Sequence, residues 1–165
     1  MRNRLKLSTT ATLALGVVLG VAGTSLAGLW NKAEMNHARN VEKDRKARIR
    51  NNKAGMTLVK DAEVRRLTEA KIECYERSLK LVERYKKAIE ADDLVQSKKL
   101  REALHLLRLQ GESYNQAIEL YATSNGYKLA RKPVKEALIS TLRLTAKGLE
   151  GQAQAYDAGI NTLTQ

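Results

Sequence analysis

The chain has 165 residues, no phenylalanine, one proline, one cysteine and a formal net charge of +12 at pH 7. A single Cys74 excludes an intrachain disulfide and a cysteine-based metal cage, and the length leaves room for one modest domain. Residues 1–60 carry 12 Lys or Arg against 3 Asp or Glu, whereas residues 61–165 carry 18 against 15. The basic excess therefore belongs to the N-terminal part, and a nucleic-acid-binding fold is not the favoured interpretation.

Residues 1–6 form a basic segment, and residues 7–31 contain no charged side chain. At about 1.5 Å per residue this run spans about 37 Å as a helix, enough to cross the hydrocarbon core of a bilayer. It also has the form of a secretory signal peptide, with a small-x-small cleavage site at Ser25-Leu26-Ala27. A retained transmembrane helix is favoured by the length of the run, and a cleaved signal peptide is the alternative.

Small residues recur at every fourth position of this run. In a helix they form one ridge, and such ridges let two membrane helices approach closely. We therefore predict a membrane-helix packing contact at Thr12, Gly16, Gly20 and Thr24.

Residues 32–55 are rich in Lys and Arg and show no apolar stripe, which predicts a solvated, basic, helical stalk beside the membrane. The Asn- and Gly-containing stretch 51–55 predicts a break, after which Thr57 can cap the next helix. Basic side chains placed here suit anionic lipid headgroups or another polyanion. The predicted contact residues are Lys43, Arg45, Lys46, Arg48, Arg50 and Lys53.

Residues 56–165 predict an all-α domain, either a helical bundle or a coiled coil. Apolar residues repeat every seven positions between residues 72 and 121, interrupted only by Lys86 and Asp93. Companions lie three or four positions on, so these residues share one face of a helix. This seam can close within one chain or between chains. Its members are Ile72, Tyr75, Leu79, Val82, Ile89, Leu100, Leu104, Leu107, Tyr114, Ile118 and Tyr121.

Whether this stretch is one helix or two depends on residues 91–96. Asp93-Leu94-Val95-Gln96 has the form of a capping box, which favours a break and a helical hairpin or three-helix bundle. The second half carries an additional apolar face and is expected to be the central helix, whereas the first half needs one neighbour. Because no Gly or Pro marks the break, a single rod-like helix over 57–123 followed by a C-terminal helix is the alternative.

The C-terminal part predicts one further helix. Ser124-Asn125-Gly126 predicts the end of the preceding helix, and Pro133 suits a first helical turn. The two glycines Gly148 and Gly151 weaken the later part, so firm helix is expected only to about residue 147. Its apolar row is Leu142, Leu149, Tyr156 and Leu163, with Leu138 alongside.

The residues that would indicate an enzyme are missing from the sequence. It contains no Gly-rich phosphate loop, no nucleophile elbow and no CxxC pair. Neither His37 nor His105 has a second ligand at metal-binding spacing. We predict no enzyme, no cofactor and no metal site. Cys74 is expected to be a small apolar residue near the seam, with an intermolecular disulfide as the alternative.

In the order of its parts, the chain resembles the inner-membrane spanins of tailed phages. The shared layout is a basic start, one apolar span, a charged stalk and a helical domain. The resemblance implies an exported helical domain that bridges to an outer-membrane partner during lysis. The chain departs from that family because it lacks a proline-flanked partner-binding tail. It is also similar in layout to the small ejected virion proteins of short-tailed phages.

These features predict a non-enzymatic, membrane-anchored helical scaffold or bridging protein of a bacterial envelope or phage virion assembly. Its expected location is the inner membrane with an exported, periplasmic C-terminal domain. Its expected partners are the lipid bilayer, a second copy of the chain and another envelope or virion protein. The alternatives are a spanin-like lysis protein, a soluble exported helical protein after signal cleavage, and a protein that binds nucleic acid or another polyanion through the basic stalk. A domain facing the cytoplasm is the alternative topology.

Overall fold

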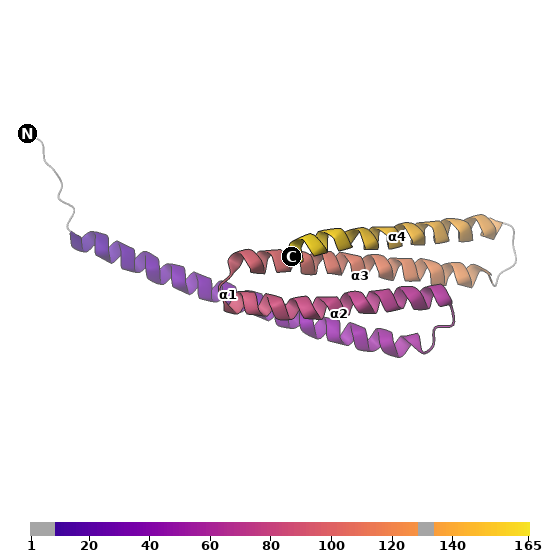
Figure 1. Ribbon diagram of the computed structural model, residues 1–165, viewed down its shortest axis with the longest axis horizontal. Helices are drawn as coiled ribbons and strands as arrows, with labels where there is room; N and C mark the ends of the chain where they lie inside the picture. The colour runs from indigo at the N-terminus through magenta and orange to yellow at the C-terminus, as the bar shows by residue number, and fades with distance from the viewer. Residues whose placement is uncertain (1–8, 129–133) are drawn as a thin grey trace, which may run out of the picture.

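The computed structural model consists of four helices joined by short connections (Figure 1). They are α1 (Thr9–Met56), α2 (Ala62–Glu90), α3 (Leu94–Lys128) and α4 (Val134–Thr164). The structure describes residues 9–128 and 134–165, with side chains for 28–125 and 136–165. Every regular element within these ranges is a helix, which confirms the predicted all-α class.

The helices form a row in which each runs antiparallel to its neighbour in the chain (Figure 1). Packing pairs α1 with α2, α2 with α3, and α3 with α4. Among the described residues, no Cα atom of α1 lies within 8 Å of one in α3 or α4. Consequently α1 and α4 are the edge helices. The first part of α1 extends beyond the row at the end where α2 turns into α3 (Figure 1).

The predicted break between residues 91 and 93 is confirmed, so the single rod-like helix over 57–123 is wrong. The backbone N–H of Gln96 donates to the Asp93 carboxylate at 2.9 Å, which is the capping bond that the sequence predicts. Asp92 turns the chain with a φ of 52°, in the left-handed region that Asp adopts more readily than most residues. The N–H of Asp93 closes the turn by donating to the carbonyl of Ala88 at 2.9 Å.

The predicted start of α2 is wrong. Helix α1 continues through residues 51–55 to Met56, and the N-cap of α2 is Asp61, whose carboxylate accepts from the N–H of Val64 at 3.0 Å. Thr57 instead donates its hydroxyl to the carbonyl of Ala54 at 2.9 Å. An aspartate caps a helix at least as well as a threonine does, so the capping role falls to the later residue.

The predicted ends of the last two helices are also wrong. Ser124 and Asn125 lie inside α3, where the buried hydroxyl of Ser124 donates to the carbonyl of Tyr121 at 2.8 Å. Helix α4 continues past residue 147 to Thr164, since the cost of two glycines is small beside the packing of the whole helix on α3. Pro133 lies outside the described residues.

The leucine and tyrosine seam lies inside the chain, between α2 and its two neighbours. Nine of its eleven members are buried, and Leu79 and Ile118 are half-buried. Cys74 is buried in the same layer and donates its thiol to the carbonyl of Leu107 at 3.1 Å. Burial raises the pKa of the Cys74 thiol to about 12, so this cysteine behaves as a small core residue.

The most buried row between α3 and α4 consists mainly of small residues and contains no leucine. In α3 they repeat every seven positions, and in α4 an equivalent row faces them, so the two backbones can approach closely. The row in α3 is Ala103, Gln110, Ala117 and Ser124, and the row in α4 is Ala146, Ala153 and Ile160. The predicted α4 row of Leu142, Leu149, Tyr156 and Leu163 is half-buried beside them, and Leu138 is exposed.

Helix α3 has the two neighbours that its two apolar faces predict. Helix α2 also has two, which corrects the expectation of one, because α1 covers its other side. That extra contact includes polar side chains such as Glu34 and Arg45 as well as the apolar Ala38. The part of α1 that packs against α2 therefore belongs to the folded domain.

Candidate functional site

The predicted solvated stalk is a packed helix, and its inner face carries charged residues. Glu34, Ala38 and Arg45 are all buried against α2. Their spacing of four and seven places them on one face of α1. A search for apolar stripes misses this face because two of the three side chains are ionisable.

Glu34 joins three helices. Its carboxylate accepts a short hydrogen bond from the Tyr85 hydroxyl in α2 and one from the Arg101 guanidinium in α3 at 2.7 Å. Burial and the neighbouring Glu34 carboxylate raise the pKa of Tyr85 above its ordinary range. A buried carboxylate with two such donors fixes the position of α1 on the bundle.

Arg45 and Arg48 lie on the side of α1 that faces α2 and α3. The Arg45 guanidinium carbon is 5.2 Å from the centre of the Tyr75 ring, a cation–π distance, and its Nη1 donates to Asp44 at 2.6 Å. The Arg48 Nε donates to the same carboxylate at 2.8 Å, which raises the pKa of Arg48. Arg45 is buried on this side of α1, and its predicted contact with lipid or a polyanion stays a prediction.

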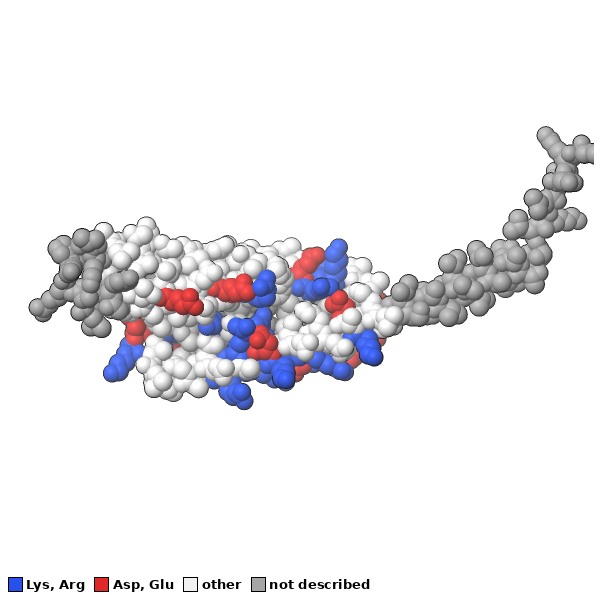
Figure 2. All heavy atoms as spheres, turned by 180° about the vertical axis from the view of Figure 1, so that it is seen from behind, with Lys and Arg blue, Asp and Glu red and all other residues white. Residues whose placement is uncertain are grey.

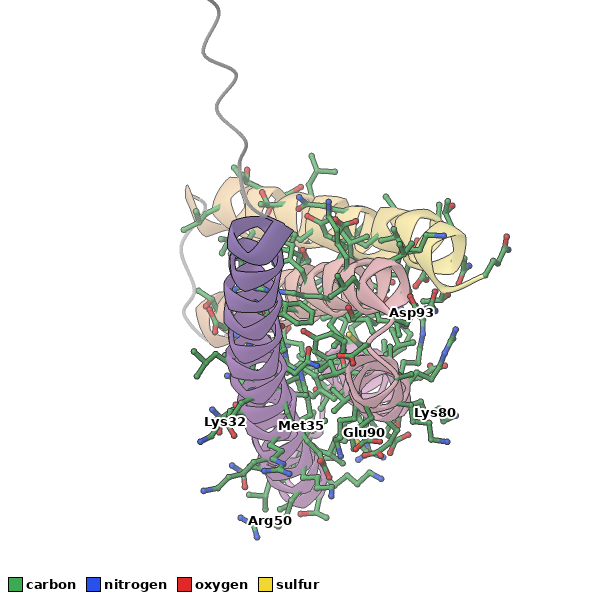
Figure 3. The ribbon with its side chains drawn as sticks, turned by 90° about the vertical axis from the view of Figure 1, so that its left-hand side faces the viewer. Lys32, Met35, Arg50, Lys80, Glu90 and Asp93 are labelled. Atoms are coloured by element: carbon green, nitrogen blue, oxygen red, sulfur yellow. The ribbon has the colours of Figure 1, made fainter. Side chains whose placement is uncertain are left out.

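The other four predicted basic contacts share the outer face of α1 with two further cations. At 100° per residue they lie within an arc of about 80°, whose centre is about 120° around the helix from the centre of the buried face, and they extend over about 32 Å. Figure 3 shows Lys32 and Arg50 on the side of α1 that faces away from α2. We call this set the basic stripe: Lys32, Arg39, Lys43, Lys46, Arg50 and Lys53.

Two members of the basic stripe are paired within the chain. Lys46 contacts Glu42 one turn earlier, and Lys53 donates to Glu76 of α2 at 2.8 Å. Both lysines are exposed, so each pair contributes little free energy. The other four cations form no ion pair with any residue whose side chain is described: Lys32, Arg39, Lys43 and Arg50.

The predicted membrane contacts Thr12, Gly16, Gly20 and Thr24 lie in the part of α1 whose side chains are not described, and residues 1–8 lie outside the described residues. Among the residues that the structure describes, no helix combines the length and the apolar character needed to cross a bilayer. The structural fact that bears on the apolar run is the continuity of α1 from Thr9 to Met56.

Exposed apolar side chains gather at the end of the row from which α1 projects. Leu29 and Trp30 lie on α1, and Leu94 and Val95 lie in the first turn of α3. Each of them is exposed, and an exposed group of apolar side chains is more informative than a single one. The exposed residues Lys98 and Lys99 follow one turn later on α3.

Comparisons of this chain with protein-family models, with curated proteins and with solved structures find no match. Within residues 28–125 and 136–165, no three His, Cys, Asp or Glu side chains are arranged to hold a metal ion. The geometry of α1 is therefore the basis for the functional argument.

Proposed function

We propose that this chain is a non-enzymatic, membrane-anchored helical protein whose bundle bridges to another component of an envelope or virion assembly. The observation that supports this most directly is that the uncharged run and the first helix of the bundle belong to one continuous helix, Thr9–Met56. With no loop between anchor and bundle, the direction of the anchor sets the direction of the bundle. Such coupling suits a protein that holds a partner at a fixed distance from a bilayer.

The exposed apolar end supports the same proposal. Leu29 and Trp30 lie at the end of the uncharged run, and tryptophan is enriched where a chain leaves the hydrocarbon core. Leu94 and Val95 reach the same end from α3, with Lys98 and Lys99 close behind. Apolar side chains backed by cations match the interface of an anionic bilayer. In this proposal the end of the bundle rests on the headgroup layer.

The basic stripe would then face the aqueous phase. With α1 along the membrane normal, Lys43 lies about 18 Å beyond Asn31, more than two Debye lengths at physiological salt. Anionic lipids act weakly over that distance, so the favoured partner of the stripe is another envelope or virion protein with an acidic surface. The proposed location is the inner membrane with the bundle exported.

Carbonate extraction followed by mass spectrometry of the N-terminus tests this proposal. We expect the intact chain, still carrying residues 1–27, to stay in the membrane pellet. A mature chain that begins at Gly28 would instead support a soluble exported bundle. Cleavage there would keep Asn31, which donates a hydrogen bond to Asp92, and Glu34, which accepts one from Tyr85.

The orientation and the self-association need their own assays. A C-terminal alkaline phosphatase fusion should be active if the bundle is exported, and activity of a cytoplasmic reporter alone would reverse the topology.

Replacing Gly16 and Gly20 by isoleucine should weaken self-association in a membrane reporter assay without affecting insertion. Unchanged association would remove the glycine ridge from the proposal.

A second candidate function is binding of nucleic acid or another polyanion, favoured by the four cations of the basic stripe that are unpaired among the described side chains. It predicts that the full chain binds a polyanion column with affinity that falls steeply as salt rises. Combined Arg39→Gln, Lys43→Gln and Arg50→Gln changes should reduce the salt slope by about three. Failure of the full chain to bind at low salt would exclude this function.

A further inference from the structure

A groove runs between α1 and α3, beside the buried face of α1 and distinct from the basic stripe. Both helices pack on α2 but not on each other, so α2 forms the floor of the groove. The groove has a volume of about 390 Å³ and is lined by polar side chains from α1 and α3, with Tyr75 of α2 among them. This size is sufficient for a small ligand.

Cations outnumber anions along this groove. Arg45, Arg48 and Arg108 line it, together with His37. The two carboxylates among the lining residues are already engaged. Asp44 is shared by Arg45 and Arg48, and Glu112 accepts from Arg108 at 2.8 Å. One arginine charge is therefore left without a carboxylate of its own inside the groove.

Arg45 has an unused donor. Its side chain is only 9% exposed, yet the buried Nε has no hydrogen-bond partner among the described residues. The Nε atom itself has almost no exposed surface, so a ligand in the groove, which Arg45 lines, would contact the rest of the guanidinium. A guanidinium held in place by Asp44 and by the Tyr75 ring is already ordered, so little entropy is lost when it binds.

A further cation lies close to the groove. Lys71 of α2 is buried and donates to the amide oxygen of Asn115 at 2.7 Å. Burial and the charge of Arg48 both lower the pKa of Lys71. An anion beside Arg48 would relieve this repulsion.

We infer that the groove between α1 and α3 binds the phosphate group of a small soluble molecule, held by Arg45, Arg48 and Arg108 above the ring of Tyr75. Arginine is the preferred residue for phosphate because its planar donors match two phosphate oxygens. The groove is larger than a phosphate ion, so a phosphate monoester with a small organic group also fits. Arg45 lies about 21 Å along α1 from Asn31, so a soluble ligand is favoured over a lipid headgroup.

The test uses the full chain in detergent micelles, titrated calorimetrically with inorganic phosphate at constant ionic strength set by sodium chloride. We expect saturable binding to the wild-type chain. Arg108→Gln removes a groove cation whose side chain is half exposed, so the fold is retained, and it should weaken binding at least tenfold. Arg45→Lys, which keeps the charge and removes Nε, should weaken binding in the same direction.

Arg39→Gln is the matched control, because it removes the same side chain from the basic stripe and leaves the groove intact. Its phosphate affinity should equal that of the wild type. No saturable binding to the wild type, or an equal loss for Arg39→Gln and Arg108→Gln, would overturn the site. Parallel titrations with phosphoserine and glycerol 3-phosphate identify the source. Tighter binding of either ester would show that its organic group occupies the rest of the groove. Equal binding of all three compounds would show that the ligand is free phosphate.

Discussion

The interface of α1 with α2 and the interface of α3 with α4 stabilise the same row of helices by opposite means. Between α3 and α4, alanines and a glycine let the helices approach closely. A Cβ atom added at Gly159 would lie only 3.0 Å from the Leu106 side chain. Between α1 and α2, ionisable side chains meet, as Glu34 meets Tyr85 and Glu42 meets Lys86. The first interface depends on shape and the second on charge.

The same contrast extends to the surface. Among the exposed positions from 137 to 164, only Lys147 is charged, whereas the exposed side of α1 carries the basic stripe. Figure 2 shows a largely white upper edge, where α4 lies, and most blue side chains below it. The two edge helices thus offer different surfaces to a partner. The predictions that follow separate the two interfaces, from the largest expected effect to the smallest.

Alkaline pH should produce the largest effect, because several buried tyrosines and Cys74 lose their contributions to the free energy of unfolding over the same pH range. Burial raises the pKa of Tyr75, Tyr85 and Tyr114, and that of Cys74 to about 12. A group whose pKa is raised by folding contributes its full stability below its unfolded pKa, here 9–10, and loses it as the pH rises through the folded value. The free energy of unfolding in urea should therefore fall steeply between pH 9 and pH 12.

The fluorescence of Trp30, the single tryptophan, reports on α1, and circular dichroism reports on all four helices. We expect the Trp30 signal to change as the pH rises, because detachment of α1 lets the Tyr85 hydroxyl ionise away from the Glu34 carboxylate. Tyr85→Phe should make the pH dependence of the Trp30 signal shallower. Equal stability at pH 8 and pH 11 would show that these side chains are not buried as described.

Ala153→Leu tests the shape-dependent interface. Ala153 is fully buried, and its carbonyl accepts from Gln110 of α3 at 3.0 Å, so a larger side chain must push α4 away. Overpacking of this kind typically costs about 1–3 kcal/mol, and the upper end is expected here because both facing backbones are close. Ala155→Leu, two positions on and exposed, is the control and should change stability by less than about 0.5 kcal/mol. Urea denaturation measures both, and equal effects would contradict the described packing of α4.

Tyr85→Phe at pH 7 tests the charge-dependent interface. The change removes one of the two donors to the buried Glu34 carboxylate and leaves the ring in place. Loss of one donor to a buried charge costs about 1–3 kcal/mol. Tyr156→Phe is the control, since its hydroxyl only accepts from the exposed Gln152 at 3.3 Å. A loss for Tyr156→Phe as large as for Tyr85→Phe would remove the special role of Glu34.

The α2–α3 pair was predictable from the sequence, whereas the α1–α2 pair was not. The heptad of Leu100, Leu107, Tyr114 and Tyr121 is apolar, and such periodicity directly reports a buried helix face. The Asp93 cap was predictable because its carboxylate acts within one turn of its own helix. A pattern of apolar residues predicts that Glu34 and Arg45 are exposed, because both are ionisable. They are buried because each meets a tyrosine far away in the chain, Tyr85 and Tyr75 respectively.

The candidate site was predicted in part for the same reason. Composition located the basic cluster but could not separate its two faces. Lys43, Lys46, Arg50 and Lys53 lie on the outer stripe, while Arg45 and Arg48 turn toward the groove, because Tyr75 and Asp44 hold them there. Arg108, which comes from another helix, gave no signal within the segment. The rotation of 100° per residue in a helix is enough to identify the basic stripe from the sequence. The groove is not predictable in this way, because it depends on how α1 and α3 pack on α2.

Glycine substitutions give the smallest effects and compare an open helix face with a closed one. A Cβ added at Gly148 or Gly151 of α4 meets no atom within 4 Å, so each change to alanine should raise the free energy of unfolding by up to about 1 kcal/mol through helix propensity. At Gly111 of α3 the added Cβ would lie 3.0 Å from the ring of Tyr75, which is buried and stacked under Arg45. Because that ring has no free space, the clash should cancel the propensity gain, and Gly111→Ala should be neutral or destabilising. Urea denaturation of the three variants at one pH gives the comparison. If Gly111→Ala proved as stabilising as Gly148→Ala, Tyr75 would be free to move, and the floor of the phosphate groove would not be the fixed surface that the packing of α1 on α2 implies.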